Sequence, residues 1–507
     1  TIGESTYFIA TATYNQVLAP GALTEISLSQ IALDKTATNE DVEAFGDTYQ
    51  ILVKSQGIQA DGFDTAMLAL DEGFGEITAT NIPWENDNPN KGGDLTTALH
   101  YLNADPTGTE IVTSITSIVF GKTSEYPAIA NNYKGYLIDV EQDTDAYAYY
   151  VENSRMTKAA PTYTIYVLSE DVIYAPKDST SLFAGMSLLA KMDTGNFDVS
   201  RMEIADRLFH SCAKLSALDV SKWNTGRITS ANNMFFSCTA LKTLDVSNWD
   251  VSGMSNMGTA FQQCWALKTL DVSKWDTSNV TTMGWMFYGC RNLEVIDISK
   301  WNVSNVTVMS HMFADCNKVK ELKVDNWDLS SLQSLDATFN DCDSLTTINV
   351  SQWNTGNVRE FSQTFEGCDN LAQIIGLENW NTTNGKVFDE MFNACKSLKV
   401  LNLSSFDTRN VTPGFKNVNG DLCKGFSSTF AGMNSVEKII LGPNFRFAGN
   451  GQVTEQYQPK FPNPVSIDGQ ATKWYNAAND TYYTAAEIPE PNGETVTYVA
   501  AIPPVNP

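Results

Sequence analysis

The chain has 507 residues, of which 42% are hydrophobic and 18% charged, and its 33 basic and 59 acidic residues give a net charge of −26. This composition supports packed cores and excludes bulk disorder. The acidic balance argues against nucleic-acid binding, because neutralising phosphate needs Lys and Arg. No run approaches the ~18–20 apolar residues of a membrane-spanning helix, so we expect no membrane insertion.

The first segment, residues 1–112, predicts a small α+β domain. Tyr7–Tyr14 is a β-prone run with alternating side chains. Asn39 begins a helical pattern with one apolar face, and Asp94–Leu102 predicts another short helix. We expect this domain to mediate attachment or self-assembly. The alternative is that it serves only as a large N-terminal cap for the segment that follows.

An internal repeat dominates the chain. Tryptophan and cysteine recur every 26 residues, and both series lengthen to 27 at Ile375–Gly376, so one repeat carries one inserted residue. Met186 and Met433 take the cysteine place at the two ends, and Gly414–Gly425 is a 12-residue insertion. About ten repeats fill 181–446. The cysteine ladder is Cys212, Cys238, Cys264, Cys290, Cys316, Cys342, Cys368 and Cys395.

One repeat reads L-x-x-L-D-V-S-x-W, then a polar turn, then V-x-x-M-x-x-M-F-x-x-C. Strand alternation places Leu270 and Val272 inward and Asp271 outward. The 3, 3, 1, 3 spacing of Val280 to Cys290 predicts a short helical or 3₁₀ arc with one buried face. Only stacking buries the two apolar edges of such a unit. The sequence therefore predicts a leucine-rich repeat solenoid with one parallel strand per coil.

The units LDVSKWDTSNVTTMGWMFYGC (270–290) and IDISKWNVSNVTVMSHMFADC (296–316) resemble the BspA-like leucine-rich repeat surface proteins of bacteria. The segments at 115–127, 162–186 and 473–489 resemble the lead-in and closing segments of these proteins, so the resemblance covers roughly 113–500. It implies extracellular display at a cell surface and adhesion or recognition, with no catalytic residues. The chain ends VAAIPPVNP without a wall-sorting motif, which leaves the mode of anchoring open.

The resulting organisation is an N-terminal domain at 1–112, a lead-in and cap at 113–180, repeats at 181–446, and a C-terminal cap and tail at 447–507. Caps are expected because an end coil otherwise exposes its core edge.

The cysteine ladder predicts buried free thiols. Equivalent atoms on adjacent coils lie within disulfide reach, but Met186 and Met433 share the position and cannot form a bridge. No C-x-x-C pair or histidine spacing fits zinc, and the oxygen side chains of 85–94 do not fit a calcium loop. We therefore expect no metal and no cofactor. We expect His210 and His311 to be surface or rim histidines.

The outward strand positions are the candidate binding residues. Adjacent carboxylates ~5 Å apart repel by roughly 0.8 kcal/mol in water, which solvation tolerates. One interpretation is an acidic strip that faces a cationic or hydroxyl-rich partner. The other is a solvated face whose side chains bond to neighbouring turns. The residues are Asp219, Asp245, Asp271, Asp297, Lys323, Asn349 and Asn402.

These features predict a non-enzymatic extracellular recognition or adhesion protein that binds a protein or glycan ligand on another cell or particle. The alternative is a structural component of an extracellular assembly, such as a filament, a surface layer or a phage virion, that displays the repeats outward.

Overall fold

The computed structural model describes residues 111–133, 135–140, 144–153, 162–417 and 420–504, together with Leu95 and Leu99. The chain divides into two compact units, Thr1–Asp87 and Asn88–Pro507, and the described residues belong to the second. The strand expected at Tyr7–Tyr14 and the helix expected from Asn39 lie outside the described residues. Of the segment Asp94–Leu102, only Leu95 and Leu99 are described, and both are helical and buried. The domain boundary at residue 112 stays a prediction.

A five-stranded sheet in the order β2-β3-β4-β1-β6 precedes the repeats. Strand β1, next to the edge strand β6, is parallel to β4 and to β6, whereas β3 is antiparallel to both of its neighbours. Because β6 already belongs to the first coil, the sheet joins the stack without a break. The elements are η4 (Ile111–Ser114), β1 (Ile115–Gly121), η5 (Thr123–Glu125), α4 (Pro127–Asn132), β2 (Tyr136–Val140), β3 (Thr144–Glu152), β4 (Tyr163–Leu168) and β6 (Lys191–Asp193).

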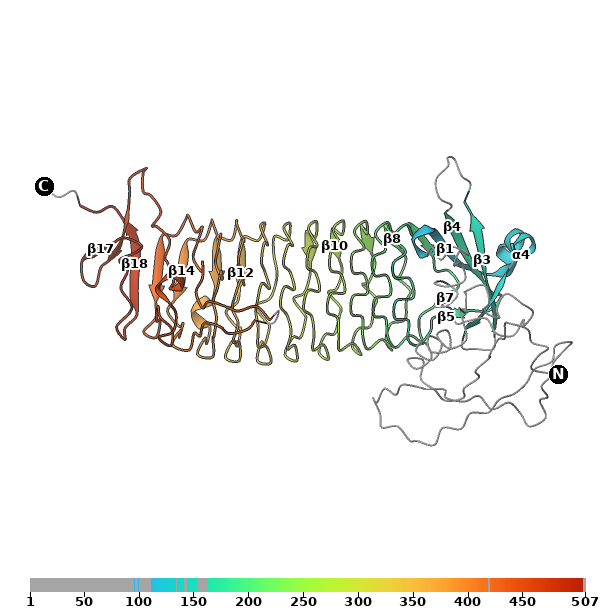
Figure 1. The fold of residues 1–507 in the computed structure, drawn as a ribbon, viewed down its shortest axis with the longest axis horizontal. Coiled ribbons are helices and arrows are strands. Elements are labelled where there is room, and N and C mark those ends of the chain that lie inside the picture. Colours follow the sequence, from blue (N-terminus) through green and yellow to red (C-terminus); the bar gives the residue numbers. More distant parts are fainter. Residues whose placement is uncertain are drawn as a thin grey trace, which may run out of the picture. The chain divides into compact units, whose positions relative to one another are not determined.

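The repeats form successive coils that stack on one another (Figure 1). Short parallel strands pair at the repeat spacing, as in Ala217↔Thr243 and Thr269↔Val295. A second line of parallel bridges runs through Ile204, Ser230, Asn256, Thr282 and Val308. The short strands are β5 (Ile173–Tyr174), β7 (Phe197–Asp198), β8 (Ala217–Leu218), β9 (Thr243–Leu244), β10 (Thr269–Leu270), β11 (Val295–Ile296), β12 (Thr347–Asn349), β13 (Gln373–Ile375), β14 (Val400–Leu403) and β15 (Lys438–Leu441).

The predicted strand alternation is confirmed in the coil that contains β10. Leu270 is 3% exposed and Val272 is fully buried, whereas Asp271 between them is exposed. The inward side chains of all coils join one continuous core with Leu95 and Leu99. Burial of this apolar surface is the main stabilising contribution, at about 25 cal/mol per Å².

The predicted helical arc is wrong, although its buried face is correct. Met283, Met286 and Cys290 are fully buried, but their segment consists of turns. Alternate backbone N–H groups donate within the coil (Met286 to Met283, 3.2 Å) and to the next coil (Trp285 to the Ser310 carbonyl oxygen, 2.9 Å). Positive φ angles at Trp285 (60°) and Gly289 (72°) produce this alternation, which a helix does not allow.

The shared lengthening at Ile375–Gly376 has a local structural basis. Gly376 adopts φ = 87°, and a Cβ atom there would overlap the backbone of Ser351 on the preceding coil. The left-handed region and the close approach both favour glycine. The added residue is absorbed in the 3₁₀ turn η6 (Leu377–Asn379) before Trp380 resumes the ladder.

A second sheet, in the order β14-β15-β18-β16-β17, follows the last coil. β18 (Val496–Ala501) pairs antiparallel with β15 and so covers the hydrogen-bonding edge that the last coil would otherwise expose. The remaining elements are η7 (Glu455–Tyr457), β16 (Lys473–Asn476) and β17 (Thr481–Tyr483).

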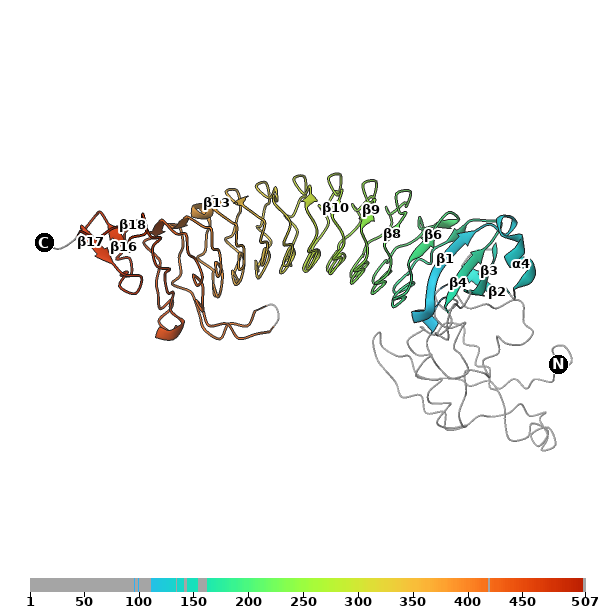
Figure 2. The same cartoon turned by 90° about the horizontal axis from the view of Figure 1, so that it is seen from above.

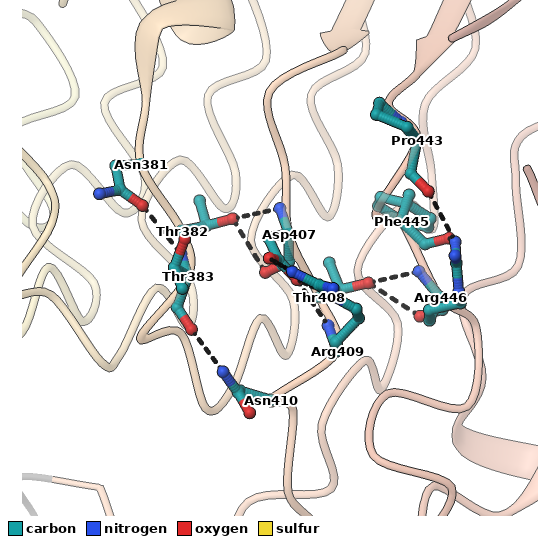
Figure 3. A network of polar contacts seen from close by, with 10 residues as sticks. All are labelled: Asn381, Thr382, Thr383, Asp407, Thr408, Arg409, Asn410, Pro443, Phe445 and Arg446. Atoms are coloured by element: carbon teal, nitrogen blue, oxygen red, sulfur yellow. Dashed lines mark hydrogen bonds and ion pairs between the residues drawn. The ribbon is translucent and has the colours of Figure 1, made fainter. Parts of the chain in front are cut away.

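Buried threonines hold neighbouring coils together near this end (Figure 3). The Thr382 hydroxyl donates to the carbonyl oxygen of Asp407 (3.1 Å) and accepts from its N–H (2.8 Å). Thr408 repeats the arrangement with Arg446, at 2.9 and 2.6 Å. Arg409 closes the network with two bonds to the Asp407 carboxylate, at 2.9 and 2.6 Å. Where no strand forms, the threonine hydroxyls thus satisfy backbone N–H and C=O groups of the neighbouring coil.

Candidate functional site

The predicted strip of outward residues forms one column across the stack. Asp219, Asp245, Asp271, Asp297 and Lys323 are exposed, whereas Asn349 and Asn402 are partly buried. The charges of Asp219 and Asp271 both act on Asp245, and Lys323 acts on Asp297, which confirms that successive members are neighbours.

Most of these side chains stabilise their own turns. Asp271 Oδ1 accepts from Ser273 Oγ (2.7 Å) and Ser273 N (3.1 Å). The hydrogen bond from the Ser273 hydroxyl is the largest of the effects that lower the pKa of Asp271 below its ordinary value. Asn402 Oδ1 likewise accepts from Ser404 N at 3.2 Å. These contacts fit the solvated face that was the alternative interpretation, and the binding role of the strip stays a prediction.

The ladder cysteines are free and buried. Each thiol donates to the carbonyl oxygen of the phenylalanine one coil earlier, for example Cys290 to Phe261 at 3.2 Å and Cys316 to Phe287 at 3.2 Å. Burial raises the pKa of Cys290 to about 12, so the thiolate needed for oxidation or metal binding is strongly disfavoured. The ladder is therefore a packing element that also satisfies a backbone acceptor.

The tryptophans form a second internal ladder. Trp275 and Trp301 stack with ring centroids 6.1 Å apart and planes inclined by 3°. Nε1 of Trp301 donates to the Val272 carbonyl oxygen at 3.2 Å. Trp327 is equally buried, at 1% exposure, but its Nε1 has no hydrogen-bond partner. These rings are core residues and offer no stacking surface to a ligand.

A different set of aromatic residues, here called the aromatic patch, occupies variable positions of three adjacent coils. The rings of Trp285 and His311 stack at 3.8 Å with planes inclined by 5°, and Tyr288 lies 4.9 Å from Trp285. Trp265 is 42% exposed, and the guanidinium of Arg291 lies 5.6 Å from its ring centroid. The aromatic patch consists of Trp265, Trp285, Tyr288 and His311. A surface or rim position was expected for His311, but its side chain is only 13% exposed because the Trp285 ring covers it. Sequence reasoning missed the other three, whose signal was bulky rings at positions that the repeat leaves variable.

Next to the aromatic patch lies a group of carboxylates, here called the acidic patch. Burial and then the negative charges of Asp315 and Asp341 raise the pKa of the Tyr288 hydroxyl. Tyr288 therefore lies where the two patches meet. Burial, followed by the charges of neighbouring carboxylates, raises the pKa of Asp341. Salt bridges lie at its two sides, Arg291–Asp315 at 3.6 Å and Lys396–Asp369 at 2.7 Å. The acidic patch consists of Asp315, Asp341, Asp343, Glu366 and Asp369.

Beneath the exposed rings and carboxylates lie the buried Asp336 and the mostly buried His311 of the aromatic patch. Asp336 is 1% exposed and neither of its carboxylate oxygens accepts a hydrogen bond. His311 Nδ1 lies 3.7 Å from Asp336 Oδ2, which is too long for a hydrogen bond. Burial raises the pKa of Asp336 to about 8 and lowers that of His311 to about 4. Both groups are therefore neutral at pH 6–7, and the pair is not an ion pair there.

The insertion around Gly414–Gly425 accounts for part of this burial. It leaves the stack as a hairpin (Figure 2), with Cys423 N donating to the Phe415 carbonyl oxygen at 2.8 Å. The charges of Glu360 and Asp336 act on Cys423, so the hairpin lies over their coils. Glu360 is 2% exposed, whereas Val308, two coils earlier in the same column, is 40% exposed.

Across the described ranges, no group of three or more His, Cys, Asp or Glu side chains is arranged to hold a metal ion. Within the same ranges no helix has the length and apolarity needed to cross a bilayer. The residues at 85–94 that were weighed against calcium lie outside the described part of the chain.

No curated protein matches this sequence. A solved structure, the functional domain of InlJ from Listeria monocytogenes, described as including a cysteine ladder, is 13% identical. That alignment covers 62% of this chain and 71% of the other, with a TM-score of 0.12. Residues 177–269, 255–348 and 333–420 each match the family described as "Mycoplasma protein of unknown function, DUF285". The described part of the chain is mostly β with few helices and has periodic cysteines, and its segment 177–420 is similar to the repeats of this family.

Proposed function

We propose that this protein is a non-enzymatic recognition or adhesion protein, built on a leucine-rich repeat solenoid of the BspA-like type and displayed at an extracellular surface. The observation that supports this proposal is a division between two kinds of repeat position. Repeated positions serve the stack, as Cys290 and Trp301 do through bonds to the preceding coil. Variable positions such as Trp285 and Asp341 instead collect on one face.

The variable face has properties expected of a binding surface. Aromatic side chains dominate the energetics of protein interfaces when they can be buried by a partner. Trp265 is 42% exposed and its coil neighbour Arg291 presents a charged group beside it. A stack of coils presents such residues at a regular spacing over an extended surface, and this suits recognition of a large partner.

The two histidines that the structure describes, His210 and His311, support the non-enzymatic part of the proposal. His311 is held neutral beneath Trp285 with a pKa lowered to about 4 by burial, so it is a poor general base near neutral pH. His210 Nδ1 lies 3.0 Å from its sequence neighbour Ser211 Oγ, and the ring stacks on Phe236 at 4.7 Å. Neither histidine is oriented by a carboxylate within hydrogen-bond distance, as a nucleophile–base pair requires.

The test combines native size with display. We expect light scattering of the full chain to give a monomer or small oligomer, and antibodies against it to label intact cells of the source organism. A large regular assembly would favour the structural alternative instead. Labelling that appears only after the cells are permeabilised would contradict surface display.

We further propose that residues 1–112 provide attachment or self-assembly. The informative truncation begins at Asn88 rather than at residue 113, because Leu95 and Leu99 belong to the core of the second unit. We expect the shortened chain to keep the circular dichroism spectrum of the coils and to lose attachment. Attachment equal to that of the full chain would assign the anchor to Asn88–Pro507.

A further inference from the structure

The aromatic and acidic patches lie side by side, and their chemistry defines one class of partner. We infer that together they form a docking surface for a basic segment of another protein, whose arginine or lysine side chains lie over the rings while their charged groups face the carboxylates. This inference rests on the proposed recognition function and assigns the partner's chemistry.

The first argument is electrostatic. Five carboxylates of the acidic patch are accompanied by two basic groups, Arg291 and Lys396, which pair with Asp315 and Asp369. Asp341 lies between these pairs, and the neighbouring carboxylates act on it repulsively. A cationic partner relieves that repulsion, whereas an anionic one increases it. The chain as a whole is also negatively charged, with a net charge of −26.

The second argument is the aromatic geometry. A guanidinium or ammonium group is attracted to the face of a tryptophan or tyrosine ring within about 6 Å of its centroid. Arg291 already lies 5.6 Å from the centroid of Trp265. Within the same patch, Tyr288 is partly exposed and is acted on by Asp315. A cation beside Tyr288 would therefore meet an aromatic ring and a carboxylate together.

The third argument is that the fold does not require these residues. Trp285 has φ = 60°, in the left-handed region that bulky residues rarely adopt. Asn233, two coils earlier in the same column, has φ = 56°, and asparagine tolerates this conformation well. The same conformation recurs on the two adjacent coils, at Thr259 (φ = 56°) and His311 (φ = 57°). The stack therefore sets the backbone at this position but not the side chain, which leaves the tryptophan available for a binding surface.

The fourth argument is the polar layer under the patches. Asp336 is 1% exposed with both carboxylate oxygens lacking hydrogen bonds, and His311 Nδ1 also lacks one. The His311 ring stacks against the ring of Trp285, with their centroids 3.8 Å apart. Asp336 is neutral at pH 6–7, but a cation bound above it would favour its ionised form, whereas an anion would disfavour that form.

The experiment measures binding of a ten-residue arginine peptide to the full chain by isothermal titration calorimetry at low and at physiological salt. Trp285→Asn removes the ring in a backbone conformation that asparagine favours, and Asp341→Asn removes one carboxylate. The matched control is Asp271→Asn, which removes the same charge from the outward strip. Asparagine at that place can still accept from Ser273, as Asn402 does from Ser404.

We expect Asp341→Asn to weaken binding about tenfold, as the loss of one charge-assisted contact predicts, and Trp285→Asn to weaken it about fivefold. Asp271→Asn should change it less than twofold. Equal weakening by Asp341→Asn and Asp271→Asn, with no effect of the uncharged exchange Trp285→Asn, would mean that net charge alone holds the peptide, and would overturn the inference. So would the absence of binding, or binding of a neutral oligosaccharide that Trp285→Asn abolishes while the arginine peptide is ignored. These results would leave the recognition function to be judged by cell labelling and native size.

Discussion

Two tryptophans of the internal ladder make a matched pair for a stability test. Trp301 and Trp327 occupy equivalent positions on adjacent coils and are each 1% exposed. Nε1 of Trp301 donates to the Val272 carbonyl oxygen at 3.2 Å, whereas Nε1 of Trp327 is buried without a partner. Substitution by phenylalanine, which occupies this place naturally at Phe406, removes the same volume and the same N–H group from both sites.

The two substitutions should differ in their effect on stability. Trp301→Phe loses a hydrogen bond with a net contribution of about 1 kcal/mol. Trp327→Phe removes a buried, unsatisfied donor whose desolvation costs about 1–3 kcal/mol. Both substitutions remove the same volume, so the cost of the cavity cancels in the comparison. We therefore expect Trp301→Phe to be the more destabilising by about 2–4 kcal/mol. Trp301→Ala, which also removes the ring, should cost about 3–5 kcal/mol.

The measurement is urea unfolding followed by circular dichroism, with comparison of the midpoints at an unchanged slope. A changed slope would show that the coils no longer unfold together, and hydrogen exchange of the neighbouring coils would then report the local stability. Equal losses for the two phenylalanine variants, or a greater loss for Trp327→Phe, would refute the reasoning from the indole hydrogen bond.

Three further predictions concern the core. Thiol titration should find the ladder cysteines 212–395 unreactive in the native chain and all nine thiols reactive in denaturant without reductant, and a smaller number would reveal bridges. Thr382→Val should cost about 1–2 kcal/mol through its lost bonds to Asp407, while exposed Thr383→Val should cost little. Because the pKa of Asp336 is raised to about 8, stability should fall by roughly 1–2 kcal/mol between pH 6.5 and 8, and Asp336→Asn should abolish that fall.

The pH interval in the last prediction follows from the opposite signs of two buried groups. Protonated Asp336 stabilises the folded chain at low pH, and this contribution is lost as the pH rises from about 4 to about 8. Neutral His311, with its pKa lowered to about 4, contributes stability that is lost as the pH falls below about 6.5. The two effects oppose each other between pH 4 and 6.5, so only the interval above 6.5 isolates Asp336.

Spacing in the sequence predicted the parts of the fold that depend on period alone. The interval of 26 residues gave the pairing of Thr269 with Val295, and period-two alternation gave the inward Leu270 and Val272. The arc from Val280 to Cys290 was not predictable in the same way. Its apolar spacing imitates a helix, but the conformation depends on N–H groups that donate to a coil 26 residues away, which no local pattern encodes.

The candidate strip illustrates a signal that was present but not used. Asp271-Val272-Ser273 places a serine two residues after the aspartate, the spacing at which such a side chain bonds its own turn. The same D-V-S spacing recurs at Asp219 and Asp245, where the serine hydroxyl bonds lie at 2.6 and 2.7 Å. A carboxylate engaged in this way is first a turn-stabilising group, and its place in an exposed column is insufficient evidence for binding.

The aromatic and acidic patches lay beyond sequence reasoning for a different reason. A repeat is recognised by the residues that recur. Residues at variable positions, such as Trp285 and Asp341, do not appear in the consensus sequence. In the folded chain each of them lies beside the variable residues of the coils before and after it, which are 26 residues distant in sequence. The constant positions determine where the variable ones meet. A solenoid sequence therefore reveals its binding chemistry when its variable columns are read along the stack, coil by coil, rather than along the chain.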